Sequence, residues 1–306
     1  MISVEHLTRK FGAVTAVDDL SFEVQEGEAF SFLGPNGAGK TTTMRILCCL
    51  IAKTSGTASI GGYDVANPAD ALKIRGMLGF VPDDVGLYNE LSVTENLKFY
   101  ARLYDFPEGR ARQNIEHFLK LLGLWEQKDV PAGTLSKGMK QKLSIARALV
   151  HEPKVLCMDE PTANLDPDAS KTVRDFILGL KSEKRTILLN THNLSEAQVL
   201  SDRIGILKTR LLTVGTPGQL EESLWGVKTE ITLASPSEAV SQAIEKLAPG
   251  LVEVQGDKIL VKVKDAVSEN PAIVEAIVHA GGHIVAVSPL VSTLEDVYLK
   301  FVRDEK

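Results

Sequence analysis

The eight residues from Gly34 to Thr41 restrict the fold of this chain more than any other segment. They read G-P-N-G-A-G-K-T, which matches the pattern G-x-x-x-x-G-K-S/T, and they lie between the apolar run Phe30–Leu33 and a helical pattern over Thr41–Leu50. Glycines let consecutive backbone N–H groups converge on phosphate oxygens, and the positive end of the following helix points at the same place. Lys40 is expected to reach the β- and γ-phosphates of a nucleotide, and Thr41 to place its hydroxyl on Mg²⁺.

A second apolar run ends in two carboxylates. Val155–Met158 is predicted to be a buried strand, and Asp159 and Glu160 follow it directly. Carboxylates often close strands, so the pattern alone is weak. Together with the upstream phosphate loop, it indicates that Asp159 holds the hydration shell of Mg²⁺ and that Glu160 activates the attacking water.

Strand-like and helical patterns alternate over most of the chain before Thr216. Further strands are predicted at Leu78–Val81, Thr186–Asn190 and Ile204–Leu207. This alternation favours an α/β fold with a mostly parallel sheet covered on both faces. A capping box at Ser92–Glu95 opens helical spacing that continues to about Leu124. Residues 90–150 are therefore interpreted as a helical insertion into the sheet.

The pattern changes near Thr216, where Pro and Gly follow. We predict a nucleotide-binding domain over residues 1–220 and a smaller α+β accessory domain over residues 221–306. The order β-α-β-β-α-β is expected for the second domain, which suggests a ferredoxin-like module. Its predicted elements are a strand at 228–234, a helix opening at Ser235–Glu238, a hairpin of 251–254 and 258–263, a helix at Pro271–Ala280, a strand at His283–Val287, and a final helix with a capping box at Ser292–Glu295.

Composition limits the class of partner. The 306 residues carry 34 Lys and Arg against 40 Asp and Glu, a net charge of −6 without a long basic stretch, so no binding to nucleic acid is expected. The longest apolar runs, such as Ile46–Ala52, are far shorter than the ~20 residues that cross a bilayer, and no signal peptide is visible. Cys48, Cys49 and Cys157 are interpreted as small buried side chains in a reducing compartment. The chain taken alone is expected to be cytoplasmic.

The segment Leu135–Gln141 reads L-S-K-G-M-K-Q, and Ser136 is predicted to cap a helix there. Lys137, Lys140 and Lys142 crowd the start of this helix, where a cation is unfavourable by up to ~0.3–1 kcal/mol. Two interpretations stay open. The lysines are solvated surface groups, or the helix end receives an anion such as a nucleotide triphosphate.

With these motifs, the chain resembles the ATP-binding subunits of ABC transporters over about residues 1–220. Leu135–Lys140 is similar to the family signature L-S-G-G-Q. Ser136 and Gly138 are kept, whereas Lys137 and Met139 depart from it. Position relative to the other motifs further implies Phe11 as the aromatic ring that stacks on adenine, Asp166 as part of the D-loop Asn164–Asp166, and His192 as the switch histidine.

The resemblance implies a head-to-tail homodimer that holds two ATP molecules, each between the phosphate loop of one subunit and the Ser136 helix of the other. Glu160 is then the base that polarises water, His192 stabilises charge on the γ-phosphate, and Lys40 and Mg²⁺ neutralise the developing charge. Hydrolysis removes the γ-phosphate contact and opens the dimer. The implied ATP contacts are Phe11, Gly34, Asn36, Gly37, Gly39, Lys40, Thr41, Thr42, Ser136, Gly138 and Asp166.

Asp83 stands where the family usually has a glutamine, in the segment G-F-V-P-D that ends at this residue. Either side chain offers an oxygen to Mg²⁺, which prefers hard oxygen ligands. The implied metal ligands are Thr41, Asp83 and Asp159. Because aspartate adds a negative charge near the triphosphate, we hypothesise that Asp83 makes ATP binding more strictly dependent on the metal.

The C-terminal unit and the S-K-G-M-K form of the signature together resemble the ATPases of ABC-2 type exporters, the daunorubicin-resistance-like group. This resemblance implies an ATP-hydrolysing subunit at the inner face of the cell membrane, with the membrane-spanning permease on a separate polypeptide. One alternative is a soluble ABC-type ATPase with a non-membrane partner, although such proteins usually carry two cassettes, a coiled coil or basic arms. The other is a low-turnover ATP-binding regulatory module, which the altered signature and Asp83 suggest. The transported substrate is not encoded here, because specificity would reside in the membrane chain.

Overall fold

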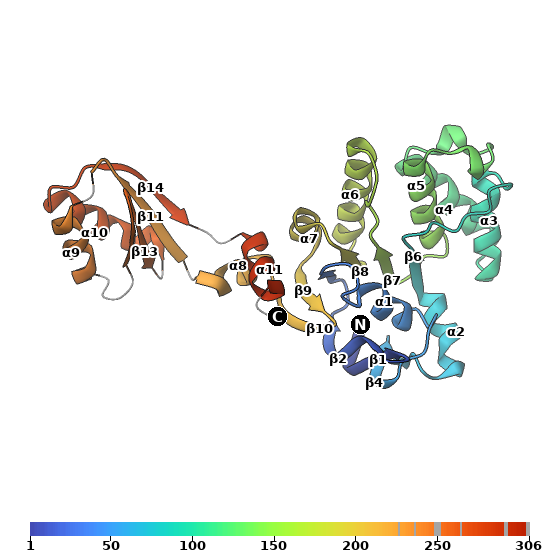
Figure 1. Ribbon diagram of the computed structural model, residues 1–306. Coiled ribbons are helices and arrows are strands. Elements are labelled where there is room, and N and C mark those ends of the chain that lie inside the picture. Colours follow the sequence, from blue (N-terminus) through green and yellow to red (C-terminus); the bar gives the residue numbers. More distant parts are fainter. Residues whose placement is uncertain (226, 236, 248–251, 264, 291–292, 304–306) are drawn as a thin grey trace. The chain divides into compact units, whose positions relative to one another are not determined.

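The computed structural model describes all residues except 226, 236, 248–251, 264, 291–292 and 304–306 (Figure 1). The chain forms two compact units, Met1–Thr216 and Pro217–Lys306. The division falls slightly before the boundary predicted near residue 220, because helix α8 (Pro217–Trp225) already belongs to the second unit.

The first unit is built on a six-stranded sheet of order β10-β9-β3-β8-β7-β6. All neighbours pair in parallel except β10, which is antiparallel to β9. Parallel strands place their carboxyl ends at one edge, so the segments after Leu33, Asp159 and Thr191 meet there. The strands are β3 (Ala29–Leu33), β6 (Leu78–Val81), β7 (Val155–Asp159), β8 (Thr186–Thr191), β9 (Arg203–Lys208) and β10 (Arg210–Gly215).

Both faces of this sheet are buried, which explains the continuous apolar runs of its strands. Successive side chains of β7 point to opposite faces: Val155 and Cys157 join one core cluster, and Leu156 and Met158 join the other. The first cluster lies under α1 (Lys40–Leu47), and the second lies under α6 (Pro167–Ser182) and the helical insertion. The predicted two-sided α/β layer is confirmed.

The sequence patterns missed a second sheet in the first unit. It is antiparallel with order β2-β1-β4-β5, and its apolar side chains pack into the cluster that contains Phe30 and Phe32. Helix α2 (Pro68–Met77) leads from it to β6. The strands are β1 (Ile2–Phe11), β2 (Val14–Val24), β4 (Ser55–Ile60) and β5 (Tyr63–Asp64).

The helical insertion lies between β6 and β7 and consists of α3 (Val93–Leu103), α4 (Glu108–Leu121) and α5 (Lys137–Leu149), which Figure 1 shows grouped together. The capping box at Ser92 is confirmed, since Ser92 Oγ accepts from the Glu95 backbone N–H and Glu95 accepts from the Ser92 N–H. The helical pattern expected to run on to Leu124 is interrupted before Pro107, because the residue that precedes a proline is disfavoured in helical conformation.

The second unit contains an antiparallel sheet of order β12-β13-β11-β14 covered by helices α9 and α10, in the expected order β-α-β-β-α-β. A final helix, α11, packs against α8. The bounds are β11 (Val227–Leu233), α9 (Glu238–Leu247), β12 (Val252–Gln255), β13 (Lys258–Val263), α10 (Ala266–His279), β14 (Ile284–Leu290) and α11 (Leu294–Arg303).

Two helix starts and one capping pair in the second unit were predicted wrongly. Helix α9 begins at Glu238, and Ser237 rather than Ser235 accepts from the N–H of its first turn. Helix α10 begins at Ala266, before Pro271, because Asp265 accepts from two backbone N–H groups there. The reciprocal cap of α11 joins Thr293 and Asp296, one residue later than predicted. The predicted positions Pro236, Leu251 and Ser292 lie outside the described residues.

Two further expectations concern the three cysteines and membrane-spanning helices. Cys48 and Cys157 are buried, Cys49 is half-buried, and all three are free thiols. Burial raises the pKa of Cys48 well above the usual thiol value, as expected for an inert core side chain. Within the described residues, no helix is both long enough and apolar enough to span a membrane.

Candidate functional site

The phosphate loop folds around the side chain of Lys40. Its Nζ atom donates to the carbonyl oxygens of Gly34 at 2.6 Å and Pro35 at 3.2 Å, and only 6% of the residue is exposed. Gly39 has φ of 97°, and a Cβ there would lie 2.5 Å from the carbonyl oxygen of Ala16. Glycine is therefore required at this position by both conformation and space. The loop therefore holds the Lys40 ammonium in place at the edge of the sheet before a ligand binds.

The remaining nucleotide contacts predicted on this loop lie at the start of α1 or just before it. Asn36 and Gly37 are exposed, and Gly37 has φ of 83°. Thr41 and Thr42 are half-buried in the first helical turn. A Cβ on Gly34 would lie 2.3 Å from the carbonyl oxygen of Leu207, so the close approach of β9 fixes this glycine.

Glu160 follows β7 and contacts residues from the segments that follow β3 and β8 at the same edge of the sheet. Its Oε1 atom lies 3.9 Å from Lys40 Nζ, and its Oε2 atom lies 2.9 Å from His192 Nδ1. The backbone N–H of Glu160 donates to the carbonyl of Asn190 at 3.0 Å, and its φ is 50°, a left-handed conformation that is uncommon for glutamate. Strained conformations of this type cluster at functional sites. The structure thus brings together Lys40, Glu160 and His192, which lie far apart in the sequence.

Charge and burial oppose each other at Lys40. Burial lowers the pKa of Lys40 below the ordinary value for a lysine, while the nearby carboxylates of Glu160 and Asp159 act in the other direction. A bound polyphosphate would add negative charge beside the ammonium and favour its charged form. The site is electrostatically suited to an anionic ligand.

Asp159 and its neighbour Asn190 fit a metal site. Asp159 is 2% exposed and accepts a hydrogen bond from Asn190 Nδ2 at 2.9 Å. Asn190 is fully buried, and within the described part of the chain no group donates to its Oδ1 atom. Mg²⁺ typically keeps several waters and binds one or two carboxylates together with substrate phosphates. A buried carboxylate beside an unpaired oxygen acceptor suits such a hydrated ion.

Asp83 lies in a small cavity of about 250 Å³. The cavity is also lined by Glu160, by Lys137 and Lys140 of helix α5, and by Asn164. Two of the three departures from the family motifs, Asp83 and Lys137, therefore line the same cavity, whereas Met139 does not. The lining contains two carboxylates and two ammonium groups, so its formal charges balance.

The signature segment is held by helix caps. Ser136 Oγ accepts from the Met139 N–H at 3.2 Å, and Asp166 accepts from the Ala169 N–H at 2.8 Å as the cap of α6. A Cβ on Gly138 would lie 3.0 Å from the Cβ of Ala169 and 3.7 Å from the Asp166 carboxylate, so the missing side chain permits the close packing of α5 and α6. These three residues have local structural roles beside the predicted contacts with ATP.

Phe11 lies at the end of β1, in the hairpin with β2 that also carries the Ala16 carbonyl beside Gly39. Its ring is 46% exposed, and the guanidinium of Arg9 lies 4.3 Å from the ring centroid. An exposed aromatic face next to a cation is suited to stacking on a nucleobase.

Sequence reasoning missed several buried polar groups around this edge. Glu196 is 3% exposed and accepts from Thr162 Oγ1 at 2.5 Å and from Thr191 Oγ1 at 3.5 Å. Arg147 is buried and donates to the carbonyls of Val85 at 2.7 Å and Gly86 at 2.8 Å, which ties α5 to the loop after Asp83. Only Asn190 carried a sequence signal, as a polar residue at the end of an apolar run.

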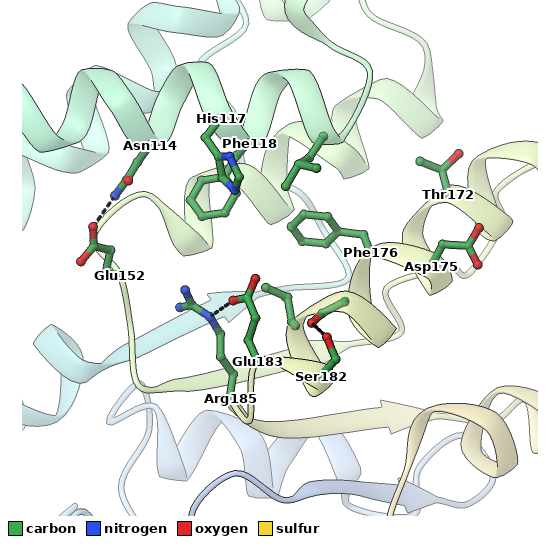
Figure 2. A pocket seen from close by; sticks show the side chains of 13 residues that line it. Asn114, His117, Phe118, Glu152, Thr172, Asp175, Phe176, Ser182, Glu183 and Arg185 are labelled. Carbon is green, nitrogen blue, oxygen red and sulfur yellow. Dashed lines mark hydrogen bonds and ion pairs between the residues drawn. The ribbon is translucent and has the colours of Figure 1, made fainter.

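Another cavity, of about 710 Å³, lies between α4 and α6 (Figure 2). Asn114, His117 and Phe118 line it from α4, and Asp175 and Phe176 line it from α6. The polar groups in it are partly used, since Glu152 accepts from Asn114 and Arg185 pairs with Glu183. Among its lining residues are none of the predicted site residues.

The fold and site define a phosphate-loop nucleotide-binding protein of the P-loop ATPase class, with a helical insertion in the sheet. Comparison with known proteins narrows this class. The family model described as "ABC transporter" matches residues 17–163. The linearmycin resistance ATP-binding protein LnrL of Bacillus subtilis is 34% identical over 81% of this chain and 80% of its own length. The Nod factor export ATP-binding protein I of Cupriavidus metallidurans is 32% identical over 100% of this chain and 98% of its own length.

A solved structure of a dimeric ATP-binding cassette in a post-hydrolysis state, bound to ADP and Pi, is 26% identical with a TM-score of 0.65, over 71% of this chain and 98% of that chain. The chain belongs to the ATP-binding proteins of ABC transporters. The predicted family, P-loop ATPase fold and ATP hydrolysis are confirmed. The main predicted function, an ATP-hydrolysing subunit of an ABC transporter that exports, is supported by the family model and by the name of the Nod factor relative.

Proposed function

We propose that two copies of this chain close head-to-tail on two ATP molecules, open after hydrolysis, and so drive export by a separate membrane-spanning subunit. The observation that carries the proposal is the contact of one carboxylate, Glu160, with both Lys40 and His192 beside the phosphate loop. The dimer is supported by the dimeric solved cassette, and export by the name of the Nod factor relative.

Each residue of this cluster has a chemical task in the proposal. Glu160 accepts the proton of the attacking water, and His192 stabilises charge on the γ-phosphate. Lys40 neutralises negative charge on the transferred phosphoryl group. Bound Mg²⁺, held by Thr41 and Asp159 with Asp83 nearby, would supply further charge neutralisation. Ser136 and Gly138 would present the start of α5 to the ATP of the other subunit.

The membrane-spanning partner is proposed to dock in a second cleft of about 330 Å³. Its lining comes from the sheet, through Leu78 and Phe80, and from the helical insertion, through Tyr104 and Arg147. Leu50 adds an aliphatic side chain that is 53% exposed. Arg147 also donates to two carbonyls of the loop after Asp83. A segment of the partner bound in this cleft would therefore contact a residue that is hydrogen-bonded to that loop. In the proposal, the chain binds this partner at the inner face of the membrane.

Leu50→Glu tests this docking cleft. The variant replaces an exposed aliphatic side chain of the lining by a carboxylate, so we expect loss of co-purification with an integral membrane protein, while ATP hydrolysis by the isolated chain is unchanged. Leu72→Glu is the matched control, because Leu72 is 75% exposed on α2 and does not line the cleft. Retention of the membrane partner by Leu50→Glu, or its loss in both variants, would contradict the proposed docking position.

Asp83→Gln tests whether this carboxylate couples nucleotide binding to the metal. Removing its charge should raise ATP affinity in EDTA by about three- to tenfold and change the affinity in Mg²⁺ less. The measurement is the ratio of the two dissociation constants, with the exposed neighbour Asp84→Asn as the control. An unchanged ratio would show that Asp83 does not set the metal dependence.

The low-turnover alternative is favoured by one observation, the joint presence of Asp83, Lys137 and Lys140 around Glu160. It predicts tight ATP binding with slow phosphate release. A steady-state assay of the purified chain with Mg²⁺, with and without solubilised membranes from its source, separates it from the exporter proposal. Phosphate release that rises with membranes supports the exporter, and release that stays slow under both conditions supports the regulatory module.

A further inference from the structure

Asn190 is the next-to-last residue of a strand whose middle residues, Ile187–Leu189, are apolar. It lies on β8, between β3 and β7 in the sheet, and its side chain is fully buried. A buried amide costs free energy unless its donors and acceptors are paired. Here one pairing is made with a functional carboxylate, through Nδ2 to Asp159 Oδ1 at 2.9 Å. The opposite orientation of the amide would put two oxygens against each other, which fixes its assignment.

The backbone of the same residue holds the next carboxylate. The Asn190 carbonyl accepts from the Glu160 N–H at 3.0 Å, at the point where Glu160 takes φ of 50°. One residue of β8 therefore contacts both Asp159 and Glu160, through its side chain and its main chain. The apolar neighbours Leu188 and Leu189 make only the ladder contacts of the strand and core packing.

The side-chain oxygen of Asn190, Oδ1, takes no part in these two contacts. In the described residues Oδ1 is buried and has no hydrogen-bond partner. Its Nδ2 also lies 3.7 Å from Met44 Sδ on α1, the helix that follows the phosphate loop. Buried acceptors are nearly always paired in native proteins, by protein or by ordered water. An unpaired acceptor on the side chain that holds Asp159 is suited to a water bound to a cation at that carboxylate.

We infer that Asn190 is a positioning residue for the metal site of this ATPase. Its amide orients Asp159 and receives a hydrogen bond from the hydration shell of the ion. Its carbonyl holds the backbone of Glu160, and that contact does not depend on the side chain at position 190. The inference rests on the proposed use of Asp159 as a metal ligand and deepens it.

Asn190→Leu removes the amide while keeping a similar side-chain volume. Asn190→Ser retains a polar side chain, although a shorter one, and serves as the second variant if Asn190→Leu does not fold. The measurement is the affinity for a fluorescent non-hydrolysable ATP analogue in Mg²⁺ and in EDTA. We expect the gain in affinity given by Mg²⁺ to fall about 10- to 100-fold in Asn190→Leu, as for other partners of metal ligands, and by less in Asn190→Ser. Affinity in EDTA should change less than about twofold, since the phosphate loop is untouched.

Ser31→Ala is the matched control, because Ser31 is a fully buried polar residue on the adjacent strand β3, where its hydroxyl pairs with Ser201. It should leave the ratio of the two affinities unchanged. A purely structural role of Asn190 would lower binding equally in Mg²⁺ and EDTA, and that result, or a wild-type ratio in Asn190→Leu, would overturn the inference. Failure of the proposed function would differ, because the wild-type chain would then gain no affinity from Mg²⁺.

Discussion

Glu160→Gln is expected to bind ATP, to hydrolyse it about 10²- to 10⁴-fold more slowly than the wild type, and to elute as a dimer in gel filtration with ATP and Mg²⁺. The amide has the shape of the carboxylate but does not accept a proton from water. It also removes the negative charge that lies 3.9 Å from Lys40 and 2.9 Å from His192. ATP then persists at the interface, and the closed dimer accumulates.

Glu183→Gln provides the control, because Glu183 is an exposed glutamate that pairs with Arg185 in the cavity between α4 and α6. It should hydrolyse ATP at the wild-type rate and show no ATP-stabilised dimer. Phosphate release and elution volume are measured with the same preparations. Normal turnover by Glu160→Gln would remove this residue from the catalytic role, whereas slow turnover without a dimer would contradict the proposed closure on ATP.

Lys40→Met is expected to weaken ATP binding about ten- to 100-fold, because charge-assisted hydrogen bonds contribute about 1.5–3 kcal/mol. The ammonium is already held by the Gly34 and Pro35 carbonyls, so little further ordering is needed on binding. Methionine has a similar length, but it leaves Glu160 without its cationic neighbour and the Gly34 carbonyl without its donor. Isothermal titration calorimetry with ATP in EDTA measures the loss without hydrolysis.

Lys53→Met is a matched control for Lys40→Met. Lys53 Nζ also donates to a backbone carbonyl, that of Gly56 at 2.7 Å, but in the segment that leads into β4. It should bind ATP with the affinity of the wild type. Equal losses in the two variants would indicate a general loss of folded protein, which the thermal midpoint of each variant would reveal. Wild-type affinity in Lys40→Met would exclude the proposed contact with phosphate.

The phosphate loop and the strands around it were predictable because their signals are local. A Cβ at Gly34 or Gly39 would collide with a backbone oxygen, so only glycine fits there. This constraint appears directly in the sequence as the glycines of the motif. The parallel sheet also made one tertiary inference possible, since the order of strands brings their carboxyl ends to one edge. The meeting of Lys40, Glu160 and His192 follows from that rule.

The antiparallel sheet of the first unit was not predictable in the same way. Strand β1 is regular only in part, with three shifts in register against β2, and its exposed and buried residues do not alternate cleanly. Helix starts in the second unit were misplaced for a related reason. Several adjacent residues there can cap a helix, and the choice of Ser237, Asp265 and Thr293 depends on where the chain leaves the sheet.

The sequence by itself determined the residue types that bind phosphate, the strand that ends in two carboxylates and the division of the chain into two units. These properties depend on short spacings and on apolar patterns. Only the tertiary structure placed Asp83 with Lys137 in one cavity and tied Asn190 to Asp159. Such contacts join residues far apart in the chain, and their geometry follows from strand order and helix packing rather than from any local preference.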